Sequence, residues 1–203
     1  MDAPFYVVFA GVNGAGKSTL YQSGLWQLPG MPSTMERVNP DEILREQGGD
    51  WRSSSDQLRA GREARKRINE LFEKRQSFNQ ETTLTGRLAA RNIKHARQQG
   101  YRVLVNYVGV QDAAIALERI AHRVAQGGHD IDESAVRRRF RDSLRAFSCL
   151  VGQCERATVF DNTEDFRTLA YWKDGMLGWW GGQNRYTPWL KDAILDEELW
   201  RIP

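Results

Sequence analysis

Short apolar runs alternate with longer amphipathic stretches along most of the chain. Residues 5–10 are apolar at every position, which is the composition of a strand buried on both faces. Further strands are predicted at 35–38, 77–83, 101–108 and 157–162. Apolar residues at intervals of three and four predict helices at 56–75, 88–99, 112–126 and 136–147.

This alternation predicts an α/β fold: a P-loop kinase-like three-layer sandwich with a mainly parallel central sheet and helices on both faces. The crossovers between parallel strands are expected to be right-handed, and such sheets bind ligands at the carboxyl ends of their strands. No repeat or low-complexity linker divides the sequence, so we expect one domain over residues 1–203 with a core that ends near 165. The strand at 157–162 is expected to be the last.

A segment rich in tryptophan and glycine, residues 166–203, follows this core. It contains Trp179, Trp180, Trp189 and Trp200. Its composition indicates no particular chemistry, and we expect its aromatic side chains to pack over the edge of the sheet.

The first predicted strand leads into a match to the phosphate-binding motif G-x-x-x-x-G-K-S/T at residues 11–18, and residues 19–22 can begin a helix. Glycines let successive backbone N–H groups point toward one anion at a helix N-terminus. Lys17 would contact the β- and γ-phosphates of ATP, and Ser18 would bind Mg²⁺, partly through water. The alternative is a glycine-rich turn that carries Lys-Ser by chance. The expected nucleotide contacts are Gly11, Val12, Asn13, Gly14, Ala15, Gly16, Lys17, Ser18 and Thr19, with Asn162 from the end of the last strand.

Asp41 follows the second strand, in the sequence Asn39-Pro40-Asp41. A carboxylate near a phosphate loop can accept a proton from an attacking hydroxyl, or it can hold Mg²⁺ directly or through water. We expect Asp41 to be the general base, and a helix N-cap is its alternative role.

Glu81, Thr82 and Thr83 end the third strand and are candidate contacts of a second substrate. Glu81 could instead hold a magnesium-bound water, or it could be an ordinary acid at a strand end. The fourth strand ends near Asn106 and Tyr107, where a hydrolytic P-loop motor or switch carries an Asp for Mg²⁺. The absence of that acid favours phosphate transfer over hydrolysis.

Arginines gather in the two helices that follow. Arg119 and Arg123 are one helical turn apart, opposite the apolar face of their helix. The segment Gly127-Gly128-His129 after them is a candidate hinge. Arginines on a closing segment can stabilise charge on a transferred phosphoryl group while closure excludes water, and a solvated basic face is the alternative. The next helix carries Arg137, Arg138, Arg139, Arg141 and Arg145.

Composition changes this picture little. The net charge of +3 suits an anionic substrate and does not by itself argue for nucleic acid. Cys149 and Cys154 fit neither a common zinc pattern nor a disulfide framework, so buried or half-buried reduced thiols are expected. The apolar run at 5–10 is too short for a signal peptide or a membrane span, which predicts a cytoplasmic protein.

Over about residues 5–163 the sequence resembles the zeta toxin family. The resemblance is carried by the P-loop, by Asn-Pro-Asp-Glu-Ile at 39–43 and by Phe-x-x-Glu-Thr-Thr at 78–83. Its most distinctive part is Arg-x-x-x-Arg-Val-x-x-Gly-Gly-His at 119–129, followed by Arg-Arg-Arg-Phe at 137–140.

The resemblance implies ATP-dependent phosphorylation of a UDP-amino sugar, chiefly UDP-N-acetylglucosamine at its 3′-hydroxyl. It also implies a small antitoxin protein as a partner that blocks the ATP site. The resemblance implies that Lys17 binds the phosphates, that Asp41 is the general base, and that Glu81 and Thr82 contact the sugar nucleotide. It also implies lid arginines at Arg123 and at Arg138 or Arg139.

Two other functions stay open. One is a kinase of nucleic-acid ends, which the basic helices over 59–75 and 137–145 could serve. The other is a nucleotide-binding switch without catalysis, against which Asp41 and Glu81 near the loop argue.

Overall fold

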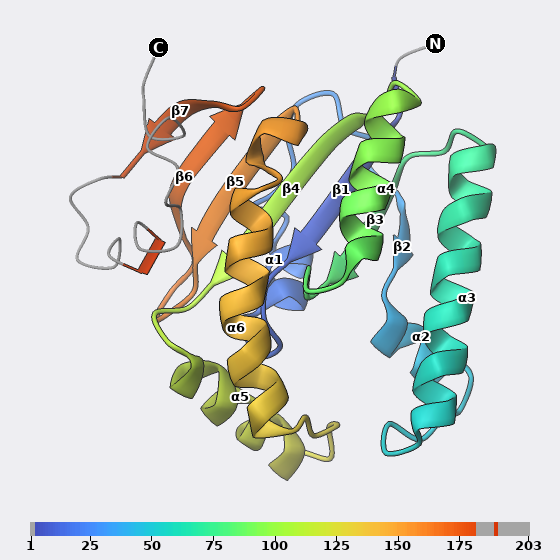
Figure 1. The fold of residues 1–203 in the computed structure, drawn as a ribbon, viewed down its shortest axis with the longest axis vertical. Helices are drawn as coiled ribbons and strands as arrows, with labels where there is room; N and C mark the ends of the chain where they lie inside the picture. Colours follow the sequence, from blue (N-terminus) through green and yellow to red (C-terminus); the bar gives the residue numbers. More distant parts are fainter. Residues whose placement is uncertain (1–2, 182–188, 191–203) are drawn as a thin grey trace.

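In a computed structural model, residues 3–181 and 189–190 are described, and they build a seven-stranded sheet between two layers of helices (Figure 1). The order across the sheet is β2-β3-β1-β4-β5-β6-β7. The first five strands in this order are parallel, and β6 pairs antiparallel with both β5 and β7, which confirms the mainly parallel sheet. The strands are β1 (Phe5–Ala10), β2 (Glu36–Val38), β3 (Phe78–Thr82), β4 (Arg102–Gly109), β5 (Arg156–Asp161), β6 (Arg167–Lys173) and β7 (Met176–Trp180).

Four of the helices, α2, α3, α5 and α6, begin at a polar N-cap residue whose side chain accepts a backbone hydrogen bond. Asp112 accepts hydrogen bonds from the backbone N–H groups of Ala114 (2.8 Å) and Ile115 (3.1 Å), as a helix N-cap does. Ser53 accepts one from Asp56 (3.3 Å). The helices are α1 (Lys17–Ser23), α2 (Pro40–Glu46), α3 (Ser54–Glu73), α4 (Arg87–Gln98), α5 (Ala113–Ala125), α6 (Glu133–Ser148) and the 3-10 turn η1 (Val151–Gln153).

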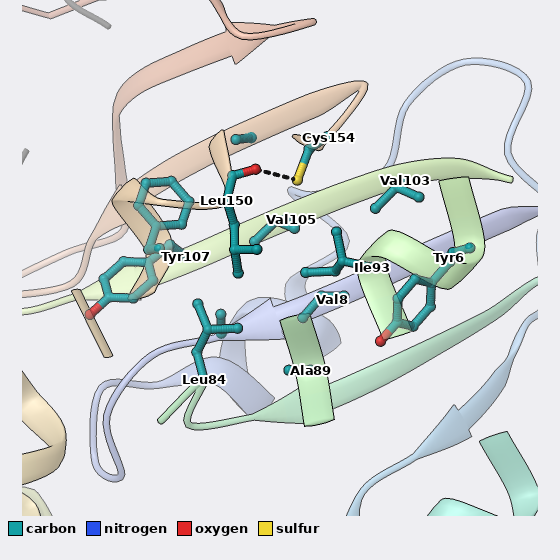
Figure 2. Packing of buried hydrophobic residues seen from close by; sticks show 14 of the residues in the cluster. Tyr6, Val8, Leu84, Ala89, Ile93, Val103, Val105, Tyr107, Leu150 and Cys154 are labelled. Carbon is teal, nitrogen blue, oxygen red and sulfur yellow. Dashed lines mark hydrogen bonds between the residues drawn. The ribbon is translucent and has the colours of Figure 1, made fainter. Parts of the chain in front are cut away.

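Each face of the sheet carries its own apolar core. Alternate residues of β1 point to opposite faces, so that Tyr6 and Val8 belong to one core while Val7 and Phe9 belong to the other. The first core lies under α2, α3, α4 and the C-terminal half of α6, and Figure 2 shows part of it around Ile93 of α4. The second lies under α1 and α5. This two-sided burial explains why every residue of β1 is apolar.

The strand order reverses beside β1, which lies between β3 and β4. The chain runs from β1 to β2 and β3 on one side, and then crosses β1 to reach β4 on the other. Open α/β sheets bind ligands at such a switch point, beyond the carboxyl ends of the strands. The loop after β1 stands at this point, so the fold places residues 11–18 where a ligand is expected.

The expectation that 157–162 is the last strand is wrong. β6 and β7 follow it and extend the sheet as an antiparallel hairpin joined by Asp174 and Gly175. Both residues have positive φ (51° and 82°), as the favoured two-residue hairpin turns require. Trp179 and Trp180 therefore lie within a strand, and Trp189 packs closely on Gly109. Trp200 is outside the described residues.

Neither cysteine forms a disulfide. Cys154 is buried and donates to the carbonyl of Leu150 (3.2 Å; Figure 2), and burial raises the pKa of its thiol to about 12. Cys149 is exposed rather than buried. None of the helices within residues 3–181 combines the length and the apolar character that crossing a membrane requires.

Candidate active site around the P-loop

The loop after β1 has a backbone that only glycine accommodates at several positions, and Gly11 and Gly16 are two of them. Gly11 has a φ of 138°, and a side-chain carbon there would lie 2.2 Å from the carbonyl oxygen of Val108. Gly16 has a φ of 101°, and a carbon there would lie 2.2 Å from Nδ2 of Asn162. Positive φ and close packing together explain the glycines of the motif. Asn162, predicted as a nucleotide contact, donates to the carbonyl of Ala15 (2.8 Å) and so supports the loop from the end of β5.

Lys17 is a buried cation at the start of α1, with 6% of its side chain exposed. Its Nζ donates to the carbonyl of Val12 (3.1 Å) and lies 3.8 Å from Oε1 of Glu81. Burial lowers the pKa of this amine, while the carboxylates of Glu81 and Asp41 oppose the shift. An ammonium group has three donors, so Lys17 retains capacity for a further anion.

Glu81, at the end of β3, faces the loop and is held by several donors. The Oγ of Ser18 donates to its Oε2 (2.9 Å), and Nη2 of Arg37 donates to the same oxygen (2.6 Å). Asn39 lies 3.3 Å from this oxygen through Nδ2. Arg37 also binds Glu42 (2.9 Å), so one largely buried guanidinium orients both acids. The carboxylate of Glu81 is therefore fixed next to the P-loop hydroxyl.

Asp41 is the second residue of α2 and does not cap it. The N-cap is Asn39, whose Oδ1 accepts from the backbone N–H of Asp41 (2.9 Å), so the alternative role of Asp41 as a cap is wrong. Pro40 occupies the first helical position, where its missing N–H costs nothing. The Asp41 carboxylate is half exposed, and its Oδ2 lies 3.5 Å from Nε2 of His129.

Of the two candidate arginines at the start of α6, the structure brings one to the loop. Arg139 is half-buried, and its Nη1 donates to Oδ1 of Asn13 (2.9 Å). Arg138 is exposed and lines none of the described pockets. Among the described residues, no hydrogen bond or pocket therefore links Arg138 to the loop, where it was expected as an alternative to Arg139.

Each arginine of α5 has one buried nitrogen atom that lacks a hydrogen-bond partner within the described part of the chain. Arg123 Nη2 donates to the carbonyl of His129 (2.8 Å), and Arg119 Nη2 donates to the carbonyl of Thr163 (3.1 Å). Arg123 Nε and Arg119 Nη1 are buried without a partner among the described residues. A buried donor without an acceptor costs free energy, so these two groups are suited to an anionic or polar ligand.

Three pockets meet at Asp41 and Asn13, which line all of them. The P-loop pocket is about 650 Å³ and is lined by Gly14, Lys17, Ser18, Glu81, Arg119 and Arg123, among others. The α3–α4 pocket is about 310 Å³ and is lined by Lys17, Ala64, Arg65, Glu81, Thr82 and Thr83, among others. The loop pocket is about 570 Å³ and is lined by Trp51, Arg52, His129, Asp130, Asp132 and Arg139, among others.

Most of the predicted nucleotide contacts line the P-loop pocket. These are Asn13, Gly14, Gly16, Lys17, Ser18, Thr19 and Asn162. Gly11, Val12 and Ala15 are buried and do not line it. Sequence reasoning missed Arg37 as a site residue, and it treated His129 only as part of a hinge and of the family motif. The one signal in the sequence for Arg37 as a site residue is that it places a charge inside the short predicted strand at 35–38.

Comparison with known proteins places the chain among P-loop proteins. Residues 7–150 match the AAA domain family. An uncharacterized protein of Haemophilus influenzae is 30% identical over 134 residues, which are 66% of this chain and 91% of that protein. The structure of the PezAT chromosomal toxin-antitoxin system of Streptococcus pneumoniae has a TM-score of 0.60 at 14% identity, over 97% of this chain and 80% of that chain.

The complex AvrRxo1-ORF1:-ORF2, whose structure is also known with ATP, has a TM-score of 0.68 at 14% identity. The match covers 94% of this chain and 63% of that chain. At such low identity these two structures show the fold alone, and that fold is P-loop kinase-like. Because the family match spans well over half of the chain, from β1 to the end of α6, the protein belongs to the AAA domain family.

Proposed function

We propose that the protein is an ATP-dependent phosphotransferase with an alcohol group as acceptor, and that the acceptor is a UDP-amino sugar such as UDP-N-acetylglucosamine. The observation that carries the proposal is that Lys17 and Asp41 both line the P-loop pocket and the α3–α4 pocket. A donor and an acceptor bound in these pockets would meet between a buried cation and a half-exposed carboxylate. Such positioning supplies much of the catalysis of phosphoryl transfer.

The P-loop pocket supports ATP as the donor. Its volume of about 650 Å³ suits a ligand of nucleotide size. The glycine-rich loop opens a helix, which is a site for phosphate, and Lys17 adds a positive charge. The unsatisfied donors of Arg119 and Arg123 line the same pocket.

Mg²⁺ fits beside Ser18. The ion prefers oxygen ligands and usually keeps several waters, and Ser18 Oγ and Glu81 Oε2 lie 2.9 Å apart at the loop. Ser18 would bind the ion, Glu81 would accept a hydrogen bond from one of its waters, and the ion would neutralise charge on the phosphates. Among the residues that the structure describes, no group of three His, Cys, Asp or Glu side chains could hold a metal, so few protein ligands would be used.

Asp41 would act as the general base. Its carboxylate would take the proton of the acceptor hydroxyl while the hydroxyl oxygen bonds to the γ-phosphorus of ATP. The bond from that phosphorus to the bridging oxygen would break, and ADP would leave. Arg139, bound to Asn13 of the loop, would stabilise the charge that develops on the transferred group.

The α3–α4 pocket supports a polar, anionic acceptor. Thr82 and Thr83 give its wall hydroxyl groups, and Ala64 and Ile68 give it an apolar side. Arg65 adds a positive charge at this pocket. The choice of a UDP-amino sugar rests on the resemblance to the zeta toxin family. The same resemblance leads us to propose a small antitoxin protein as a partner.

Three of the cations of α3 argue against a nucleic-acid substrate. Arg59 pairs with Asp56 (2.9 Å) and Arg67 with Glu63 (3.2 Å) on the same helix. Lys66 also has a glutamate one turn away, at 3.9 Å. Cations that are neutralised by their own helix are poorly placed to bind a phosphate backbone.

The test is to incubate the protein with ATP, Mg²⁺ and UDP-N-acetylglucosamine and to look for the phosphorylated sugar nucleotide by mass spectrometry. Asp41→Asn should lower kcat about 100-fold or more, because the base is lost, and should leave ATP affinity unchanged in calorimetry. Full transfer by a folded Asp41→Asn variant would remove Asp41 from its role. A wild-type protein that phosphorylates other alcohols only would overturn the choice of acceptor.

A further inference from the structure

The segment Gly127-Gly128-His129 has no role in the proposed function, yet its geometry is tightly determined. Gly127 has a φ of 85° and donates to the carbonyl of Val124 (2.9 Å), and Gly128 donates to that of Arg123 (2.9 Å). These bonds fold the chain back over the end of α5, as a glycine C-cap does. A side-chain carbon at Gly128 would lie 2.5 Å from Cγ of Arg123, so only glycine fits.

This cap fixes where His129 stands. The carbonyl of His129 accepts from Nη2 of Arg123 (2.8 Å), so an arginine of α5 holds the backbone of the histidine. The imidazole then lies beside two residues that are distant from it in sequence: Asp41 of α2, and Trp51, whose ring centre is 6.4 Å from that of the imidazole. It lines both the P-loop pocket and the loop pocket.

The contact between His129 and Asp41 is close enough to orient the carboxylate. Nε2 of the imidazole lies 3.5 Å from Oδ2 of Asp41, slightly beyond a strong hydrogen bond. Bonds of catalytic groups are often long before a substrate is bound and tighten in the complex. Because His129 engages one carboxylate oxygen, the other oxygen stays available to an acceptor hydroxyl.

We infer that His129 is a positioning residue for Asp41: its neutral imidazole donates Nε2–H to Oδ2 and leaves Oδ1 to take the acceptor proton. The inference rests on the proposed function, because it gives Asp41 the role of base. It adds that the loop after α5 places the His129 imidazole where it can orient the Asp41 carboxylate. Arg123 acts through the loop, by holding the backbone of His129.

The charges around His129 favour the neutral imidazole. Burial lowers its pKa below the ordinary value of 6.5; the carboxylates of Asp41 and Asp130 oppose this, and the guanidinium groups of Arg123 and Arg45 add to it. The remaining charged groups that line the loop pocket with His129 are Arg52, Asp132 and Arg139. Above its pKa the imidazole can donate Nε2–H without adding a full positive charge. Below that pKa, the imidazolium stabilises the Asp41 carboxylate and makes it a weaker base.

The first test compares His129→Gln and His129→Ala in the phosphorylation of UDP-N-acetylglucosamine as a function of pH. The glutamine amide keeps a donor and does not titrate. For His129→Gln we expect kcat within about threefold of wild type at pH 7.5, and loss of the acid limb, which is the fall in kcat that we expect of wild type below about pH 6.5. The alanine should lower kcat about tenfold or more, with an unchanged KM for ATP.

His122 supplies the matched control. It is an exposed histidine on α5 that contacts Gln126 (3.0 Å) and lines none of the described pockets. His122→Gln should leave both the rate and the acid limb as in wild type. The inference is overturned if His129→Gln keeps the wild-type limb, or if His129→Ala keeps full kcat. A folded but inactive His129→Gln would overturn it too, because the imidazole would then be the base itself.

A second readout does not depend on turnover. Titration of the imidazole by NMR should give His129 a pKa below 6.5, and Asp41→Asn should lower that pKa further, because an opposing negative charge is removed. The His129 resonance is assigned by its absence in His129→Gln. An unchanged pKa in Asp41→Asn would refute the pairing. If UDP-N-acetylglucosamine is not phosphorylated, the proposed acceptor fails while this titration still decides the pairing.

Discussion

Replacement of Arg37 by methionine tests whether the acids at the phosphate loop are held by one guanidinium. Arg37 is 10% exposed and binds Glu81, itself 11% exposed, at 2.6 Å. It also binds Glu42, and its guanidinium carbon lies 4.0 Å from the centre of the Tyr21 ring. Loss of one partner of a buried ion pair costs about 3–5 kcal/mol. Because Glu81 keeps Ser18 at 2.9 Å, we expect the low end, about 3 kcal/mol.

The assay is urea denaturation followed by circular dichroism, in which this loss should lower the midpoint by about 1 M or more. Arg59→Met is the matched control, because the pair of Arg59 with Asp56 is 54% and 20% exposed and should be worth less than about 1 kcal/mol. In the double variant Arg37→Met/Glu81→Gln the cost should fall short of the sum of the single costs, since the buried charge is gone. An Arg37→Met variant as stable as Arg59→Met would refute the reasoning.

Two further substitutions have definite expected results. Gly16→Ala should abolish measurable ATP binding in calorimetry, because residue 16 has a φ of 101° and the added carbon would lie 2.2 Å from Nδ2 of Asn162. An unchanged affinity for ATP would mean that the loop can shift without cost. Arg65→Gln should raise the KM for UDP-N-acetylglucosamine about tenfold and leave the KM for ATP unchanged. Arg62→Gln, on the same helix but outside the described pockets, should change neither KM. Equal effects of the two substitutions would argue against an anionic group of the substrate at Arg65.

The parts of the fold that follow from local patterns were predictable. The apolar run of β1, the Asp112 cap and the spacing of the helices each depend on neighbouring residues only, and the predicted ranges agree with the structure within a few residues. The hairpin of β6 and β7 was missed although it has a local signal, the Asp174-Gly175 pair between two segments of strand composition.

The candidate site depends on contacts between distant residues, and there the sequence says less. Parallel strands bring their carboxyl ends together, so Asp41 and Glu81 could be placed near Lys17 from the fold class alone. Nothing local distinguishes Arg139 from Arg138, because the choice depends on how α6 faces Asn13, 126 residues earlier in the chain. The partnership of His129 with Asp41 likewise requires the loop after α5 to meet α2.

The glycines at the two sides of the site differ in how much substitution they tolerate. Added carbons at Gly11 and Gly16 would collide with their surroundings, whereas carbons at Gly61 and Gly86 would meet nothing within 4 Å. Both of these permissive positions line the α3–α4 pocket. Mutational drift can therefore reshape the wall that faces the proposed acceptor while the phosphate loop stays fixed. If the proposed function holds, a lineage with this fold can change its acceptor through single substitutions that leave the phosphate loop intact.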